Sequence, residues 1–326
     1  MTRPLALLLA AALAPFAAGQ DDPARTFERR VNDVAARETP LGRVEAVVKE
    51  LEALGLEPQR REFAGPRRPG VNVLAEVPPA DGSSPAKTLM IGAHVDRVVA
   101  GRGAVDNAGG CAAVLELIDR FRKDPLRNHR VVGLWFDQEE QGLLGSRAFA
   151  EAAGTGEEAG AAAALPDAFV NVDVFAYGAT LWVCRPAEQD RALAAPFGGV
   201  LNDDGTLFPA VIGETYPPSD HQSFAAARDA ADGTSPASDM RVISLSLLPK
   251  EQIDETVTFL EGMKTGARPA RGGLPKVLAL IHTANDTPAA VRPADAAAGI
   301  DAAERALRVY DAGAGESREE GGGSGE

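Results

Sequence analysis

The sequence predicts an α/β fold: a single domain whose central sheet is mixed and mostly parallel, with helices flanking both faces. Residues 89–93 and 131–136 are short apolar runs with a helical pattern between them, which is typical of strands buried on both faces. With 326 residues, 45% of them hydrophobic, the chain can bury one large core, and no linker is long enough to divide it. Acidic or histidine residues follow both runs, and ligands of such sheets bind beyond the carboxyl ends of the strands.

Residues 1–19 are expected to form a secretory signal peptide. Arg3 makes the start positive, residues 5–18 are apolar but too short to span a bilayer, and residues 17–19 are small enough for a cleavage site. A buried core helix fits less well, because the segment opens the chain and is apolar all round. We therefore expect export to the periplasm or the medium, with no transmembrane anchor in the mature chain.

Charge and cysteine content narrow the possible partners. The formal net charge is -14 and no basic patch or run is present, so nucleic acid is not expected as a partner. Cys111 and Cys184 could pair in an exported chain. Two separate buried thiols are the simpler interpretation, because both cysteines lie in apolar elements and the sequence does not bring their Cα atoms together.

Helices are predicted where apolar residues recur every three to four positions. Residues 21–56 are helical in character, and Gly55 is expected to end the helix over residues 44–54. The same pattern predicts helices over residues 107–122, 143–152 and 293–310, and a further helix after the turn at 217–224. Gly109 and Gly110 would let the first of these helices approach a neighbouring backbone closely.

Strands are predicted from alternation or from short apolar runs, over residues 57–63, 71–77, 88–93, 131–136, 168–174, 181–183, 240–248 and 277–281. Residues 197–215 look irregular, and residues 153–164 are typical of a surface loop. Residues 313–326 are acidic and Gly-rich, so we expect a disordered tail.

Polar side chains gather near the predicted strand ends: His94, Asp96, Asp106, Glu139, Glu140, Asp173 and His282. Imidazole nitrogens and carboxylate oxygens are zinc ligands, and two histidines with three carboxylates can hold two metals if one carboxylate bridges. Taken singly, each residue is more often a turn residue, a solvated charge or a core histidine. Just beyond a strand end, two adjacent glutamates can take different roles, one on a metal and one facing the bound water.

Six stretches carry a resemblance to a known family: GAHVD (92–96), GAVDNAGG (103–110), FDQEEQGLLGS (136–146), NVD (171–173), SDH (219–221) and HTANDT (282–287). In this order they resemble the co-catalytic di-zinc aminopeptidases of the aminopeptidase S and aminopeptidase Y type. That superfamily also contains glutamate carboxypeptidase, glutaminyl cyclase and the transferrin receptor. The resemblance implies a zinc peptidase domain of the zinc-exopeptidase type over residues 20–312.

The resemblance also implies a site with two Zn²⁺ ions. By this similarity, His94 and Asp173 are ligands of one zinc, and Glu140 and His282 are ligands of the other. Asp106 is the bridging carboxylate between them.

Two further residues receive catalytic roles by the same resemblance. Glu139 is expected to be the general base, and Asp96 the acid behind His94, where such a partner orients the ring. Ile281 stands where some family members carry a tyrosine that steadies the oxyanion, so that group is open. His221 is expected to be structural or part of a pocket wall, and residues 228–239 could form a loop over the pocket.

The expected function is that of an exported exopeptidase that hydrolyses N-terminal residues from peptides with a free N-terminus. Glu139 would take a proton from a metal-held water and give it to the leaving amine. A carboxypeptidase of the same fold should show a basic group for the terminal carboxylate, and a glutaminyl cyclase would work with one zinc. A receptor-like binding protein that has lost catalysis should lack ligands, whereas all five ligand positions and Glu139 are present.

Overall fold

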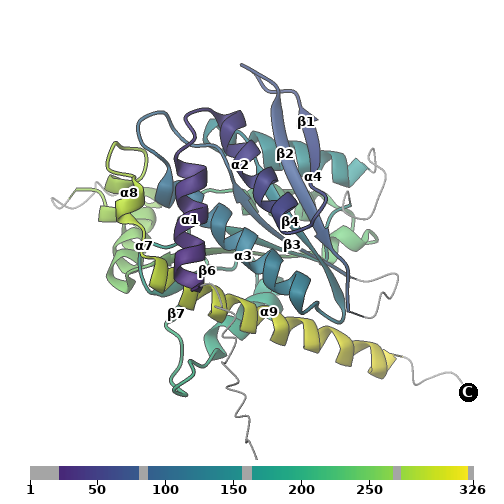
Figure 1. Ribbon diagram of the computed structural model, residues 1–326. Coiled ribbons are helices and arrows are strands. Elements are labelled where there is room, and N and C mark those ends of the chain that lie inside the picture. The colour runs from purple at the N-terminus through teal and green to yellow at the C-terminus, as the bar shows by residue number, and fades with distance from the viewer. Residues whose placement is uncertain (1–21, 81–86, 156–163, 267–272, 322–326) are drawn as a thin grey trace, which may run out of the picture.

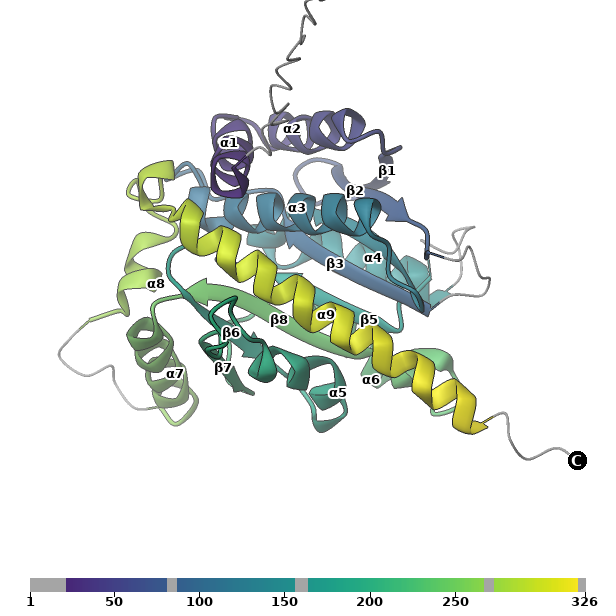
Figure 2. The same ribbon diagram turned by 60° about the horizontal axis from the view of Figure 1, so that its bottom comes forward.

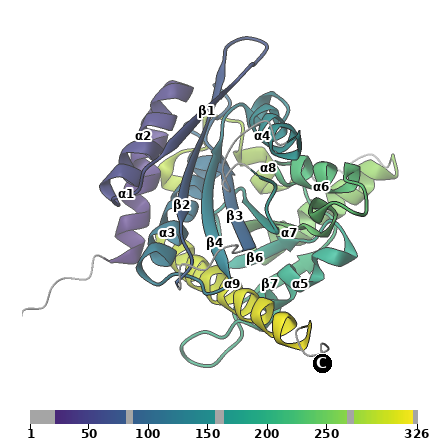
Figure 3. The same cartoon turned by 90° about the vertical axis from the view of Figure 1, so that its right-hand side faces the viewer.

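The computed structural model describes residues 22–80, 87–155, 164–266 and 273–321. Within them, one eight-stranded sheet is covered by helices on both faces (Figures 1 and 3), so the predicted α/β architecture is confirmed. The predicted signal peptide, residues 1–19, lies outside the described residues. Within the described part of the chain, no helix is long and apolar enough to cross a membrane.

The sheet has the strand order β1-β2-β4-β3-β5-β8-β6-β7. Its strands are β1 (Gln59–Phe63), β2 (Gly70–Val77), β3 (Lys87–His94), β4 (His129–Phe136), β5 (Ala168–Val172), β6 (Thr180–Cys184), β7 (Ala210–Gly213) and β8 (Arg241–Leu248). The four central strands β4, β3, β5 and β8 pair in parallel, whereas β1, β2 and β6 join antiparallel. The carboxyl ends of β3, β4 and β5 therefore meet at one edge of the sheet.

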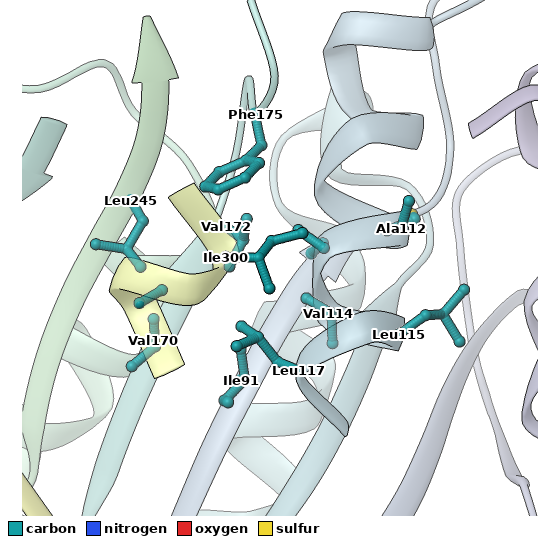
Figure 4. Packing of buried hydrophobic residues seen from close by; sticks show 14 of the residues in the cluster. Ile91, Ala112, Val114, Leu115, Leu117, Val170, Val172, Phe175, Leu245 and Ile300 are labelled. Carbon is teal, nitrogen blue, oxygen red and sulfur yellow. The ribbon is translucent and has the colours of Figure 1, made fainter. Parts of the chain in front are cut away.

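Helices form a layer on each face. They are α1 (Pro23–Ala35), α2 (Pro40–Ala53), α3 (Gly109–Lys123), α4 (Leu144–Thr155), α5 (Arg191–Ala194), α6 (His221–Ala230), α7 (Lys250–Lys264), α8 (Lys276–Leu280) and α9 (Pro293–Gly321). Figure 2 shows α1, α2, α3 and α9 on one face of the sheet, and α4 and α6 pack on the other. On the first face, Ile91, Val170 and Leu245 of neighbouring strands pack against Val114 of α3 and Ile300 of α9 (Figure 4).

Close packing of α3 depends on its two leading glycines, as predicted. A Cβ on Gly109 would lie 2.3 Å from the carbonyl oxygen of Phe175, and one on Gly110 would lie 2.6 Å from that of Val172. Both distances are too short for a side chain, so glycine is required for the helix to rest against the backbone around the end of β5.

Two predictions about secondary structure were wrong. Residues 277–280 belong to the short helix α8 instead of a strand, and Ile281 follows that helix. Pro275 starts a turn that packs on α7, and an apolar run of this length has no clear period. Residues 197–215, expected to be irregular, contain the edge strand β7, whose four residues are too few to show an alternation. The structure also continues α9 as far as Gly321, beyond the predicted end at residue 310 and into the stretch 313–326 that was expected to be disordered.

His129 is fully buried at the start of β4. Its Nδ1 lies 2.8 Å from Oδ1 of Asp311 on α9. The same carboxylate accepts the backbone N–H groups of Arg127, Asn128 and His129. This contact ties a helix near the end of the chain to a central strand of the sheet.

Candidate metal centre

Residues from five separate segments meet at the carboxyl edge of the sheet. His94 is the last residue of β3, Asp173 follows β5, and Glu140 lies in a short 3₁₀ turn after β4. Asp106 lies in a turn that leads into α3, and His282 follows α8 in a left-handed conformation with φ 61°. The sheet topology thus brings together the five predicted ligand positions.

The distances divide these residues into two pairs around one shared carboxylate. His94 Nε2 lies 3.0 Å from Asp106 Oδ1 and 3.4 Å from Asp173 Oδ1. His282 Nε2 lies 3.0 Å from Asp106 Oδ2 and 3.0 Å from Glu140 Oε2. Asp106 therefore directs one oxygen to each histidine, which is the arrangement expected of a carboxylate between two cations.

Unsatisfied oxygens at the centre fit a bound cation. Among the described residues, Glu140 Oε1 and Asp173 Oδ1 are buried without a hydrogen-bond donor. A buried carboxylate oxygen without a partner is costly, and a metal ion satisfies it. Ligand atoms of His94, Asp106 and Glu140 all lie within 4.8 Å of one another. The donors are imidazole nitrogen and carboxylate oxygen, the combination that zinc accepts.

The charges in the cluster shift the pKa values of both histidines upward. Burial alone would lower the pKa of His94, but the carboxylates around it, Glu139 first, raise that pKa well above 6.5. Hydrogen bonds with Asp106 and Glu140 raise the pKa of His282 to about 10. The same histidines hold the pKa of Asp106 well below its usual range, against the effect of burial. The cluster therefore favours positive charge at its centre.

Glu139 lies beside the two pairs and is mostly withdrawn from solvent. Burial raises the pKa of its carboxyl to about 9, an effect that the nearby His94 opposes and that Asp220 reinforces. A carboxyl group with a strongly raised pKa in a cleft is a candidate for proton transfer.

Asp96 holds two parts of the centre at once. Its Oδ1 lies 3.5 Å from Nδ1 of His94, the ring nitrogen that faces away from Asp106. Its two oxygens also accept the backbone N–H groups of Glu139 and Glu140, at 3.0 and 3.3 Å. The position behind His94 agrees with the expectation from sequence, whereas the contact with the glutamate turn could not be predicted.

Asp286 fixes the turn that carries Asp106. Its carboxylate accepts the N–H groups of Ala104, Val105 and Asp106 at 2.9, 2.7 and 3.2 Å. Asp286 lies in the same segment as His282. Its carboxylate therefore connects that segment to the turn that carries Asp106. Sequence reasoning gave Asp286 no role, although it stands in one of the six matched stretches.

Arg43 of α2 supports the loop behind the centre. Its guanidinium is fully buried and donates to the carbonyl oxygens of Val95, Arg102 and Gly103. Val95 separates His94 from Asp96. Sequence reasoning missed this residue because its partners are backbone atoms far along the chain.

A cavity of about 460 Å³ opens onto the centre. Its walls beyond the polar cluster are mainly apolar: Val174, Trp182, Tyr216, Pro217, Pro218, Leu248, Leu274, Val277, Leu278 and Ile281. Val277 and Leu278 of this wall belong to α8, and Ile281 follows it. The sequence had predicted a strand over residues 277–281. No lysine or arginine is among the described residues that line this cavity.

The remaining expectations near the site have mixed outcomes. His221 is buried at the start of α6, where its ring contacts Tyr216 edge-on and burial lowers its pKa to about 4, so a structural role is supported.

Residues 228–239 do not cover the cavity. Arg228, in the last turn of α6, forms an ion pair with Asp190. Residues after it line a separate hollow between α4 and α6. Cys111 and Cys184 are separate buried thiols, as expected.

A sheet covered on both faces, with two histidine–carboxylate pairs around one aspartate at its carboxyl edge, is typical of metal-dependent hydrolases. Residues 72–298 match the sequence model of Peptidase family M28, and the chain belongs to this family.

Individual proteins are similar over smaller parts. Leupeptin-inactivating enzyme 1 from Streptomyces exfoliatus is 35% identical over 107 residues, which are 32% of this chain and 23% of that enzyme. The chain therefore matches less than a quarter of this relative's length.

Solved structures share the fold. A zinc aminopeptidase from Bacillus subtilis superposes with a TM-score of 0.52 at 18% identity, over 77% of this chain and 52% of that one. A glutaminyl cyclase from an Acidobacteriales bacterium superposes with a TM-score of 0.60 at 14% identity, over 91% and 99% of the two chains. At these identities the likeness concerns the fold alone.

Proposed function

We propose that this chain is an exported, zinc-dependent aminopeptidase that hydrolyses N-terminal residues from peptides. The observation that carries the proposal is the shared Asp106 between two histidine–carboxylate pairs, with the half-buried Glu139 beside it. Membership of a peptidase family and the zinc aminopeptidase among the similar structures support it. After removal of residues 1–19, residues 20–312 would form the peptidase domain.

The proposed ligands follow the two pairs. His94 and Asp173 would hold one Zn²⁺, Glu140 and His282 would hold the other, and the carboxylate of Asp106 would be shared. When bound, two such ions would acidify a water molecule and polarise the scissile carbonyl. Asp96 keeps the His94 ring oriented from behind.

The proton transfers belong to Glu139. Two bound cations would lower the raised pKa of its carboxyl, because nearby positive charge favours the ionised form. The carboxylate would then accept a proton from the attacking water as the new C–O bond forms. It then delivers that proton to the leaving amine nitrogen as the C–N bond breaks, so the base returns to its starting state. The acidic cluster attracts the free α-ammonium group of the peptide, which favours removal of an N-terminal residue over removal of a C-terminal one.

The apolar cavity indicates which N-terminal residues fit. The side chain of the substrate's N-terminal residue would lie beside Trp182, Leu248 and Val277 and would leave water for an apolar surface. No described lysine or arginine lines the cavity, so the charge of an acidic side chain would have no partner there. We expect leucine and phenylalanine at the scissile position to be preferred over glutamate. The same absence of a described basic group weighs against a carboxypeptidase, which must bind a terminal carboxylate.

The decisive experiment combines a substrate panel with metal analysis of the purified chain. Aminoacyl-nitroanilides with leucine, phenylalanine or glutamate, their N-acetylated forms, and peptides with an N-terminal glutamine should be compared. Hydrolysis of the free leucyl and phenylalanyl substrates by a protein with two zinc ions supports the proposal. Cyclisation of glutamine by a protein with one zinc would establish a glutaminyl cyclase instead.

A further inference from the structure

The backbone just after Asp173 is held in an unusual conformation. Val174 has φ 50° and Ala176 has φ 80°, although neither residue is glycine. Left-handed backbone is costly for residues with a Cβ, most of all for a β-branched valine, and it persists only where the surroundings hold it. The turn that carries a proposed zinc ligand therefore needs support from neighbouring groups.

Two hydroxyl groups provide this support. Ser246 on β8 donates its hydroxyl proton to the carbonyl oxygen of Asp173, at 2.5 Å. The hydroxyl of Tyr216 lies 2.5 Å from Ser246 Oγ and 3.5 Å from the same carbonyl oxygen. Because the proton of Ser246 is directed to the carbonyl, Tyr216 is the donor to Ser246. The two side chains form a relay that ends on the main chain of Asp173.

Main-chain bonds complete the attachment to β8. The amide of Asp173 donates to Leu245 at 2.9 Å, and the amide of Leu247 donates to Val174 at 3.3 Å. These bonds fix the turn along β8, whereas the Tyr216–Ser246 relay fixes it on the cavity side. The ring of Tyr216 packs against Trp182, with 4.7 Å between the ring centroids, so the phenol has little freedom to move.

We propose that Tyr216 is a positioning residue whose hydroxyl, through Ser246, holds the Asp173 carboxylate in place for the zinc that it shares with His94. This inference rests on the proposed function. Loss of the hydroxyl should affect only the zinc position of His94 and Asp173. The ligands of the other position, Glu140 and His282, lie on segments that Tyr216 and Ser246 do not hold. The inference also distinguishes the hydroxyl of Tyr216 from its ring, which forms part of the cavity wall.

The test is a zinc titration of purified variants against a chromophoric chelator. Tyr216→Phe keeps the ring and removes the hydroxyl, and Ser246→Ala removes the other half of the relay. Each substitution should lower the affinity for one of the two zinc ions by roughly 10–100-fold, the usual effect of losing a group that orients a ligand. The affinity for the second ion should stay unchanged. Ser246→Thr retains a hydroxyl and should restore the affinity.

Tyr177→Phe is the matched control, because Tyr177 packs in the same cluster and its backbone amide donates to Leu247. It should titrate like the unmodified chain. Circular dichroism of each chelated variant checks folding, and if Tyr216→Phe does not fold, the Ser246 variants decide.

Three outcomes overturn the inference. Unchanged affinity for both ions in Tyr216→Phe and Ser246→Ala removes the positioning role. A lower kcat with unchanged zinc affinity shows that the hydroxyl acts on substrate instead. An unmodified chain that binds no zinc removes the proposed function and the inference together, whereas the first two outcomes leave the proposed function intact.

Discussion

Single residues at the centre have separable roles, although they are crowded together. Glu139 and Glu140 are adjacent, yet Glu140 contacts His282 at 3.0 Å while Glu139 lies to the side with a raised pKa. Their substitutions should therefore have different consequences.

Glu139→Gln keeps the shape of the side chain and removes the proposed base. We expect it to retain both zinc ions and to lose roughly 10²–10⁴-fold in kcat, the usual contribution of general acid–base catalysis. Glu140→Gln replaces a charged ligand with a neutral one, so zinc content should fall first and added zinc should restore part of the activity. Turnover and metal content of the two variants check this, and the opposite pattern would reverse the two assignments.

The histidines predict how zinc binding depends on pH. In the chelated protein the pKa of His94 is well above 6.5 and that of His282 is about 10, so both rings hold protons near neutral pH. Zinc needs them deprotonated, so binding should release protons and strengthen as the pH rises. Calorimetric titration in buffers of different ionisation enthalpy measures this release. Affinity that does not vary between about pH 6 and pH 9 would contradict it.

The same shifts act on stability in the absence of zinc. A histidine whose pKa is raised by folding stabilises the protein fully below about pH 6.5, and that contribution is lost as the pH rises through the folded value. Chelated protein should therefore lose stability from about pH 6.5 toward pH 10, the value for His282. Thermal unfolding across this range, with zinc-loaded protein as the comparison, checks the direction.

The residues that could be predicted from sequence are those whose type and position both carry a signal. Asp173 and Glu139 are acids just beyond buried strands, and this placement singled them out before any geometry was known. Tyr216 and Arg43 could not be found in this way. Arg43 donates to backbone oxygens of a distant segment, and Tyr216 acts through Ser246 on the backbone oxygen of Asp173. A backbone oxygen gives the sequence no residue type to recognise.

At the scale of elements, the helix α2 is a support of the metal centre. It lies before residues 72–298, the part that matches the family, yet its Arg43 donates to three carbonyl groups around the loop between His94 and Asp106. The residues before the matched part thus stabilise the loop that presents the ligands.

Arg43→Met should leave these buried carbonyl groups without donors. We expect the free energy of unfolding to fall by roughly 2–5 kcal/mol, since each lost charged hydrogen bond in the interior is costly. Arg43→Lys, with a single ammonium group that cannot reach three carbonyls in a fork, should recover only part of the loss. Denaturant unfolding measures both variants, with the exposed Arg37→Met as control. A loss no larger than that of the control would contradict the role.

Elements were predicted well where the pattern was long and poorly where it was short. The strands β3, β4 and β5 and the helix α3 have clear apolar patterns, so they were identified correctly. The turn of α8 and the strand β7 each have only four or five residues. At that length a helical and an extended backbone bury the same apolar side chains equally well, and tertiary contacts decide between them.

For the molecule as a whole, bound zinc should act as a stabilising ligand. An ion that binds only the folded state adds about 2.7 kcal/mol when its free concentration is 100 times Kd. For a chain of this size that corresponds to roughly 4 °C in Tm per ion. Chelation should therefore lower Tm and abolish hydrolysis, and restored zinc should recover both. Calorimetric scans before and after chelation check this, and an unchanged Tm would argue against metal at the centre.

Export is a prediction about the whole chain that rests on residues 1–19. Expression in a bacterium with a secretory pathway should yield a protein outside the cytoplasm whose sequence begins near Gln20. N-terminal sequencing of the recovered protein is the measurement. A chain that retains Met1 in the cytoplasm would show that the segment is not a signal.

The contact between His129 and Asp311 has a consequence for synthesis. β4 occupies the middle of the sheet, but its first residue depends on a carboxylate 182 residues further along the chain. At about 5–20 residues per second, a ribosome delivers that carboxylate roughly 10–40 s after His129. During this interval the imidazole of His129 lacks the carboxylate that contacts it in the folded structure. The contact can therefore form only after all eight strands of the described sheet have been synthesised.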